Sequence, residues 1–98
     1  MLTMRNESFD RLFKAILHLE SVEECSRFFE DICTVKEICE IAQRLDVARY
    51  LSAGKNYQEI SALTGASTAT ISRVSKCLNY GSGGYALVLG KEQEGATE

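Results

Sequence analysis

The chain has 98 residues, 45% of them hydrophobic, which is enough for one domain with a modest core and too little for a second. It contains no apolar run long enough to span a bilayer, and its first nine residues lack the uninterrupted apolar core of a secretory signal. We therefore expect a cytoplasmic protein with no membrane partner. The net charge of −3 argues against tight non-specific binding to nucleic acid.

The charge is unevenly divided along the chain. Residues 34–80 carry six cations against four anions, whereas residues 1–33 carry four against seven and residues 81–98 carry one against three. Affinity for DNA depends on Lys and Arg close to the phosphates, so an acidic total does not exclude a local binding surface. Residues 34–80 are therefore the part of the chain whose charge suits a DNA-binding surface.

The first 33 residues predict two amphipathic helices. The first helix is expected to begin at about Ser8 and to run to about residue 20, because apolar residues follow Ser8 at spacings of three and four. Ser21 and Glu24 have the spacing of a capping box and begin a second helix. Both helices are rich in large apolar residues: Phe9, Leu12, Phe13, Ile16, Leu17, Phe28, Phe29 and Ile32. This favours dimerisation through residues 8–33, although packing in the chain's own core would give the same periodicity.

A third and longer helix is predicted over residues 34–52. Thr34 and Glu37 form a further capping-box pattern, and apolar residues continue at helical spacing. The stop signal is Ala53-Gly54-Lys55. Four polar residues lie partly on one side of this helix, which we expect to be solvated: Gln43, Arg44, Asp46 and Arg49.

Residues 56–80 predict two short helices joined at Gly65, which together form a helix-turn-helix. Asn56 can cap the first helix, with a glutamate three residues later to complete the box. Gly65 can end it in the left-handed conformation, which costs a residue with a side chain about 1 kcal/mol. Ser67 or Thr68 can cap the second helix.

The second of these helices has two distinct faces. Ile71, Val74 and Leu78 form one apolar stripe, while the other face is small, polar and free of acidic groups, which suits a major groove about 12 Å wide. We predict that it binds DNA through these residues: Ser67, Thr68, Ala69, Thr70, Ser72, Arg73 and Lys76. An ordinary helical hairpin with a solvated face is the alternative. It is less favoured because such faces usually mix Glu with Lys.

Both ends of the chain are expected to be less ordered. Residues 81–89 predict a Gly-rich turn followed by a short apolar helix or strand, and we expect residues 1–7 to be flexible and residues 90–98 disordered. The four cysteines contain no Cys-x-x-Cys pair, so reduced core cysteines are favoured over a zinc site. No carboxylate pair, Ser-His-Asp set or phosphate loop is placed for chemistry, so we expect no enzyme and no bound metal.

Three motifs resemble the Trp repressor superfamily: Thr34-x-x-Glu37, Gln43-Arg44-Leu45 and Gly65-Ala-Ser-Thr-Ala-Thr-Ile-Ser-Arg73. The segment Asn79-Tyr-Gly-Ser-Gly-Gly-Tyr85 looks like the signature of its YerC/YecD-type branch, and the similarity covers roughly Phe9 to Leu89. The resemblance implies an all-α, Trp repressor-like bundle that forms an intertwined homodimer. Its two reader helices would enter successive major grooves of a palindromic operator in bacterial double-stranded DNA.

The resemblance also implies positions for a small-molecule effector. Residues that match the corepressor ligands of Trp repressors are Thr34, Arg44 and Arg73. The next residue is Gly in Trp repressors and Val74 here, and a Ser that helps to anchor the amino group of the ligand falls at Cys77. A branched side chain would fill part of a tight pocket, so we do not expect tryptophan as the ligand. Another effector is left open, and no cofactor is expected.

We therefore expect a sequence-specific DNA-binding transcriptional regulator that represses by occupying its operator as a homodimer. The alternative is a helical protein–protein interaction module that uses the same hairpin without binding DNA. The response to salt separates the two, because a complex held by phosphate contacts weakens steeply as salt rises.

Overall fold

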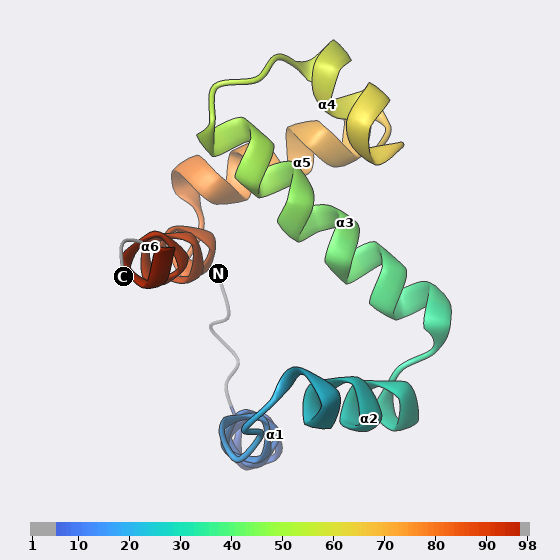
Figure 1. Cartoon of the computed structure of the whole chain (residues 1–98), viewed down its shortest axis with the longest axis vertical. Coiled ribbons are helices and arrows are strands. Elements are labelled where there is room, and N and C mark those ends of the chain that lie inside the picture. The colour runs from blue at the N-terminus through green and yellow to red at the C-terminus, as the bar shows by residue number, and fades with distance from the viewer. Residues whose placement is uncertain (1–5, 97–98) are drawn as a thin grey trace. The chain divides into compact units, whose positions relative to one another are not determined.

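The computed structural model describes residues 6–96, which fold into helices with no strand among them, as expected for an all-α protein (Figure 1). Six helices follow one another along this part of the chain: α1 (Glu7–Leu17), α2 (Val22–Ile32), α3 (Val35–Ser52), α4 (Tyr57–Thr64), α5 (Thr68–Tyr80) and α6 (Gly84–Ala96). The chain divides into two compact units, the first ending at Cys39 and the second beginning at Glu40.

Helix α1 begins earlier than the sequence pattern suggested. The side chain of Asn6 accepts a hydrogen bond from the Phe9 amide at 2.9 Å and so caps the helix, which leaves Ser8 inside the first turn. Asn is among the preferred N-cap residues, so a start at this position has an ordinary local cause. The helix also ends at Leu17, three residues before the expected end. Residues 1–5 of the predicted flexible N-terminus lie outside the described residues.

The predicted cap of α2 is confirmed in part. The Ser21 hydroxyl accepts a hydrogen bond from the Glu24 amide at 3.1 Å, as expected. The Glu24 carboxylate accepts from the Glu20 amide at 2.9 Å, one residue before the amide of a standard capping box. The rings of Phe28 and Phe29 meet edge to face with centroids 5.7 Å apart. Neither Glu7–Leu17 nor Val22–Ile32 contains a buried residue within this single chain.

The core lies in the second unit. Its buried members come from α3, α4, α5 and the turn before α5: Val47, Ala48, Ile60, Ala66, Ile71 and Val74. Partly buried apolar residues pack against this cluster: Tyr50, Leu51, Tyr85 and Leu89. Two residues of the predicted apolar stripe of α5 are buried in this core, Ile71 and Val74. They therefore fix α5 to α3 and α4.

The C-terminal segment differs from the prediction. A turn, a short apolar segment and a disordered tail were expected over residues 81–98, but α6 continues as one helix from Gly84 to Ala96. Tyr85, Leu89 and Glu92 follow helical spacing, and all three make contacts in the second unit, the first two with the core and the third with Arg49. These contacts supply the stability that the glycine-rich sequence lacks. Residues 97–98 lie outside the described residues.

The cysteines are not core residues within this chain, contrary to expectation. All four are free thiols, and they lie on exposed or half-buried positions: Cys25, Cys33, Cys39 and Cys77. Across residues 6–96, no group of three or more His, Cys, Asp or Glu side chains is placed to hold a metal ion. In the same part of the chain, no helix combines the length and apolar character needed to cross a membrane.

Candidate nucleic-acid interface

Helix α4 begins and ends as its sequence predicts. The Asn56 side chain accepts a hydrogen bond from the Glu59 amide at 2.9 Å, and the Glu59 carboxylate accepts from the Asn56 amide at 3.1 Å. Both bonds of the capping box are therefore present. At the other end Gly65 has φ = 75°, the left-handed conformation that costs a residue with a side chain about 1 kcal/mol.

Side chains satisfy the backbone of the turn between α4 and α5. Ser61 donates to the carbonyl of Ala66 at 2.9 Å, and Thr64 donates to the carbonyl of Ile60 at 2.7 Å while accepting from the Ala66 amide at 3.1 Å. The Gln43 amide of α3 donates to the Thr64 carbonyl at 3.1 Å. Gln43 is thus half-buried and bonded, where we expected a solvated side chain. The turn is therefore held by hydrogen bonds within it and by a hydrogen bond from α3.

Helix α5 is capped by Ser67 rather than Thr68. The Ser67 hydroxyl accepts a hydrogen bond from the Thr70 amide at 3.1 Å and donates to the Thr70 hydroxyl at 3.1 Å. On the inner face Ile71 is 0% exposed and Val74 is 1% exposed. The cap and the buried pair together fix where α5 starts and which face it turns outward.

The outward face of α5 carries most of the residues predicted to bind DNA. Six of them are exposed: Ser67, Thr68, Ala69, Ser72, Arg73 and Lys76. Ser67 and Thr70 are occupied by the cap, and Thr70 is half-buried. Within residues 6–96 neither Arg73 nor Lys76 forms an ion pair with a carboxylate. Both cations are therefore available to an outside anion.

The end of α5 requires glycine for a different reason from the turn before it. The Gly81 amide donates to the Cys77 carbonyl at 2.8 Å and closes the helix. A Cβ atom at position 81 would collide with the same carbonyl oxygen. Because a backbone atom is the obstacle, a side chain could not be accommodated by a change of rotamer, and the last turn of α5 would have to shift.

The residues predicted to bind an effector are divided between the two units. Thr34 belongs to the first unit, where its hydroxyl accepts from the Glu37 amide at 3.1 Å and its amide donates to the Glu37 carboxylate at 2.8 Å. Arg44 is half-buried on α3 and Arg73 is exposed on α5, both in the second unit. Neither unit contains all three residues, so this site stays a prediction. The hydrogen bonds from Thr34 lower the pKa of the Glu37 carboxyl.

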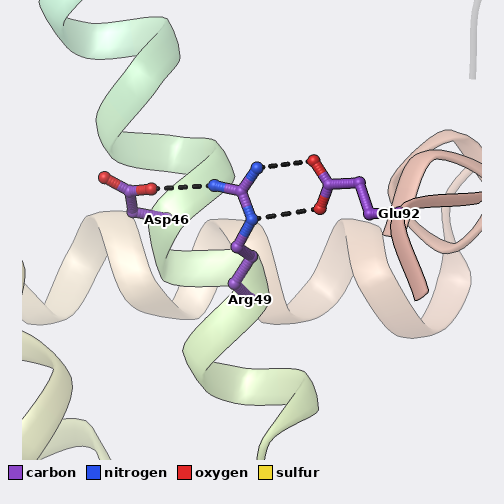
Figure 2. A network of polar contacts seen from close by, with 3 residues as sticks. All are labelled: Asp46, Arg49 and Glu92. Atoms are coloured by element: carbon purple, nitrogen blue, oxygen red, sulfur yellow. Dashed lines mark hydrogen bonds and ion pairs between the residues drawn. The ribbon is translucent and has the colours of Figure 1, made fainter. Parts of the chain in front are cut away.

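One contact of the second unit has no local sequence signal. The guanidinium of Arg49 binds Glu92 through two parallel hydrogen bonds of 3.1 and 2.6 Å, and it also binds Asp46 at 3.0 Å (Figure 2). The bond with Glu92 raises the pKa of Arg49, and Arg49 in turn lowers the pKa of the Glu92 carboxyl. The sequence pattern assigned Arg49 and Asp46 to a solvated side of α3. Only the neighbouring Asp46, three residues away, could have been identified as a partner.

The sequence model of the family described as Trp repressor protein matches residues 7–93. The chain belongs to the Trp repressor family. It is similar to the uncharacterized protein YerC of Bacillus subtilis, with 53% identity over 97% of this chain and 91% of that protein. The predicted resemblance to the YerC-type branch is confirmed.

Two solved structures share the fold. A provisionally assigned Trp repressor from Staphylococcus aureus superposes with a TM-score of 0.89 at 47% identity, covering 92% of this chain and 90% of that chain. A TrpR-like protein from Eubacterium eligens gives a TM-score of 0.90 at 43% identity, covering 95% and 96%. The Trp repressor family consists of DNA-binding regulators rather than enzymes, and the fold of this chain is that of the family.

Proposed function

We propose that this protein is a sequence-specific transcriptional repressor that occupies a palindromic operator as a homodimer. The reading element is α5, whose short polar residues lie against base edges in the major groove while Arg73 and Lys76 contact phosphates or bases. In a dimer of helix-turn-helix proteins the two reading helices reach half-sites about 34 Å apart. The dimer forms through α1 and α2.

The observation that carries this proposal is the division of α5 into two faces. Ile71 and Val74 are buried in the core, whereas Ser72, Arg73 and Lys76 are exposed and the cations are unpaired by carboxylates of residues 6–96. A polar face that served only solubility would usually carry Glu beside Lys. The first turn of α5 contains no acidic residue. Repulsion of the phosphates is therefore small on this face.

Support for the dimer comes from the apolar surface of the first unit. Leu17 is 81% exposed, Val22 88% and Ile32 53% in the single chain. Burying a Leu side chain of this kind contributes about 1.5 to 3 kcal/mol. A partner that covered these residues would therefore make a large favourable contribution to the free energy of association. A second copy supplies the same apolar surface and places two α5 helices in one assembly, as a palindromic operator requires.

The test is a selection of random double-stranded oligonucleotides with the purified protein, followed by titration of the selected site at several salt concentrations. We expect one palindromic sequence to be enriched. Affinity should fall by about a thousandfold between roughly 50 and 200 mM salt if some six phosphates are contacted. Enrichment of no sequence, or binding that barely responds to salt, would contradict the proposal and favour a protein-binding module.

A pair of lysine variants tests whether α5 is the DNA-binding surface. Lys76→Ala should weaken binding to all sequences and reduce the magnitude of the salt slope by about one unit, because one phosphate contact is lost. Lys91→Ala removes the same charge from the exposed surface of α6 and serves as the matched control, with the slope unchanged. Equal effects of the two variants would show that net charge alone, and not α5, governs binding.

Binding is proposed to be independent of tryptophan. Val74 is 1% exposed and belongs to the core, so a planar ligand lying against α5 at this point would have to displace packed side chains. Overpacking of this kind costs about 1 to 3 kcal/mol, which weakens a ligand by roughly ten- to a hundredfold. Calorimetric titration with tryptophan, combined with DNA binding in its presence and absence, tests this. Saturable micromolar binding that also tightens the DNA complex would overturn it.

A further inference from the structure

An apolar contact and an ionic contact join helix α6 to the rest of the second unit. Near its start, Tyr85 and Leu89 pack against the core. Further along, Glu92 accepts two hydrogen bonds from Arg49 of α3, and the side chains of Arg49 and Glu92 are 42% and 45% exposed. The first attachment is apolar and independent of salt, whereas the second is ionic and reached by solvent.

The sequence of α6 makes the second attachment important. Gly90 lies in the interior of the helix, where a glycine costs about 1 kcal/mol relative to Ala. A helix of 13 residues is also marginal in isolation. Gly90 stands between Leu89, the last residue that packs on the core, and Glu92. The half of α6 beyond the glycine is therefore fastened by the bond to Arg49.

We propose that Arg49 and Glu92 form a salt-sensitive clamp that keeps α6 against α3 and thereby restrains the last turn of α5. Helix α6 contacts α5 directly and follows it after a link of three residues, Gly81–Gly83. When the clamp opens, the end of α6 leaves α3 and its contacts with α5 are weakened. Asp46 holds the Arg49 guanidinium in place from the other side and so keeps it ready to rebind Glu92 (Figure 2).

Hydrogen exchange on the whole protein tests the clamp without any use of DNA. The variant Glu92→Gln removes the ionic partner, and Glu40→Gln removes one exposed carboxylate from α3 as the control of equal charge. At low salt we expect the amides of residues 89–92 to exchange about two- to fivefold faster in Glu92→Gln and at the wild-type rate in Glu40→Gln. Equal exchange of these amides in Glu92→Gln and the wild type would overturn the clamp.

Two further comparisons decide what the clamp does. In the wild type, raising the salt to about 1 M should speed exchange in α6 towards the rate of Glu92→Gln, because the Debye length falls to about 3 Å. The variant Arg49→Gln should match Glu92→Gln, and the double variant should exchange no faster than either, because both remove the Arg49–Glu92 bond and the other bond of Arg49, to Asp46, lies within α3. Exchange at residues 78–81 reports the coupling to α5. Acceleration there supports the restraint, and an unchanged rate there while α6 accelerates would overturn it.

Discussion

The two units of this protein use apolar residues in opposite ways. In the second unit, the side chains of Ile60, Ile71 and Val74 are at most 1% exposed, so a core forms within one chain. In the first unit, α1 and α2 are the more clearly amphipathic helices, yet neither contains a buried residue within Glu7–Leu17 or Val22–Ile32. Amphipathic periodicity thus identifies a face that will be covered and says nothing about which chain covers it.

The largest effect is expected where the core is complete. Ile71→Ala should lower the free energy of unfolding by about 2 to 5 kcal/mol, because buried methyl groups are lost and a cavity remains. Chemical denaturation measures this loss, and the neighbouring Ser72→Ala, which alters only the outward face, should change stability by less than about 0.5 kcal/mol. Similar losses in the two variants would show that α5 is not divided into a buried and an exposed face.

A smaller and different effect is expected in the first unit. If the proposed dimer forms through α1, Leu17→Ala should weaken association of the two copies by about 1.5 to 3 kcal/mol, because the partner would then bury this side chain. The change should appear as melting that depends more strongly on protein concentration, and sedimentation should show more monomer. Lys14→Ala on the same helix is the control. A wild-type protein that sediments as a monomer at micromolar concentration would refute the assignment of α1 to the dimer.

The third prediction concerns the part of the second unit that is least well packed. Gly90→Ala should stabilise α6 by about 0.5 to 1 kcal/mol, because alanine is the better helix former. The site has room, since a Cβ atom there meets nothing within 4 Å. Circular dichroism and denaturation check the gain. Gly65→Ala is the contrasting variant, because its φ of 75° makes the same substitution unfavourable. If both variants are destabilising, α6 does not continue as a helix through residue 90.

The smallest effects concern pH, with one carboxyl in each unit. The pKa of Glu37 is lowered by its hydrogen bonds to Thr34, and that of Glu92 by its bond to Arg49. Because its pKa is lowered by folding, each carboxylate contributes its full stabilisation of the folded state above pH 4.5, the ordinary pKa. That stabilisation is lost as the pH falls through the lowered pKa. The stability differences between the wild type and Glu37→Gln or Glu92→Gln should therefore shrink on acidification. Differences that stay constant from about pH 6 to about pH 2 would contradict this.

Local patterns in the sequence predicted the helix ends that are stabilised by hydrogen bonds between near neighbours in the chain. The capping boxes at Thr34 and Asn56 were predicted because all their atoms lie within four residues. The start of α1 was placed too late, because the apolar pattern begins at Phe9 whereas the cap is Asn6. At α2, the Glu24 carboxylate accepts from the Glu20 amide, one residue before the amide that the pattern indicates.

Contacts between distant residues were not predicted, and α6 is the clearest case. Its glycines indicated a turn and a disordered tail, whereas the helix forms because Tyr85 and Leu89 reach the core and Glu92 reaches Arg49, 43 residues earlier. Nothing in the spacing of residues 81–98 reveals those partners. The outward face of α5 could be predicted because Ile71 and Val74 identify the buried face on the other side of the helix. Thr70 was also assigned to the outward face, but its hydroxyl takes part in the cap of α5.

The separation of roles along α5 has a consequence for how such a regulator evolves. The residues that fix the helix in place, namely Ser67, Ile71, Val74 and Gly81, are different residues from Thr68, Ala69, Ser72 and Lys76 on its outer surface. Substitutions in the second set leave the cap, the core and the helix end intact. If α5 reads DNA as proposed, a new target sequence can therefore be acquired by changing a few surface positions without passing through an unfolded ancestor. For the same reason the outer residues of a relative could be grafted onto this scaffold.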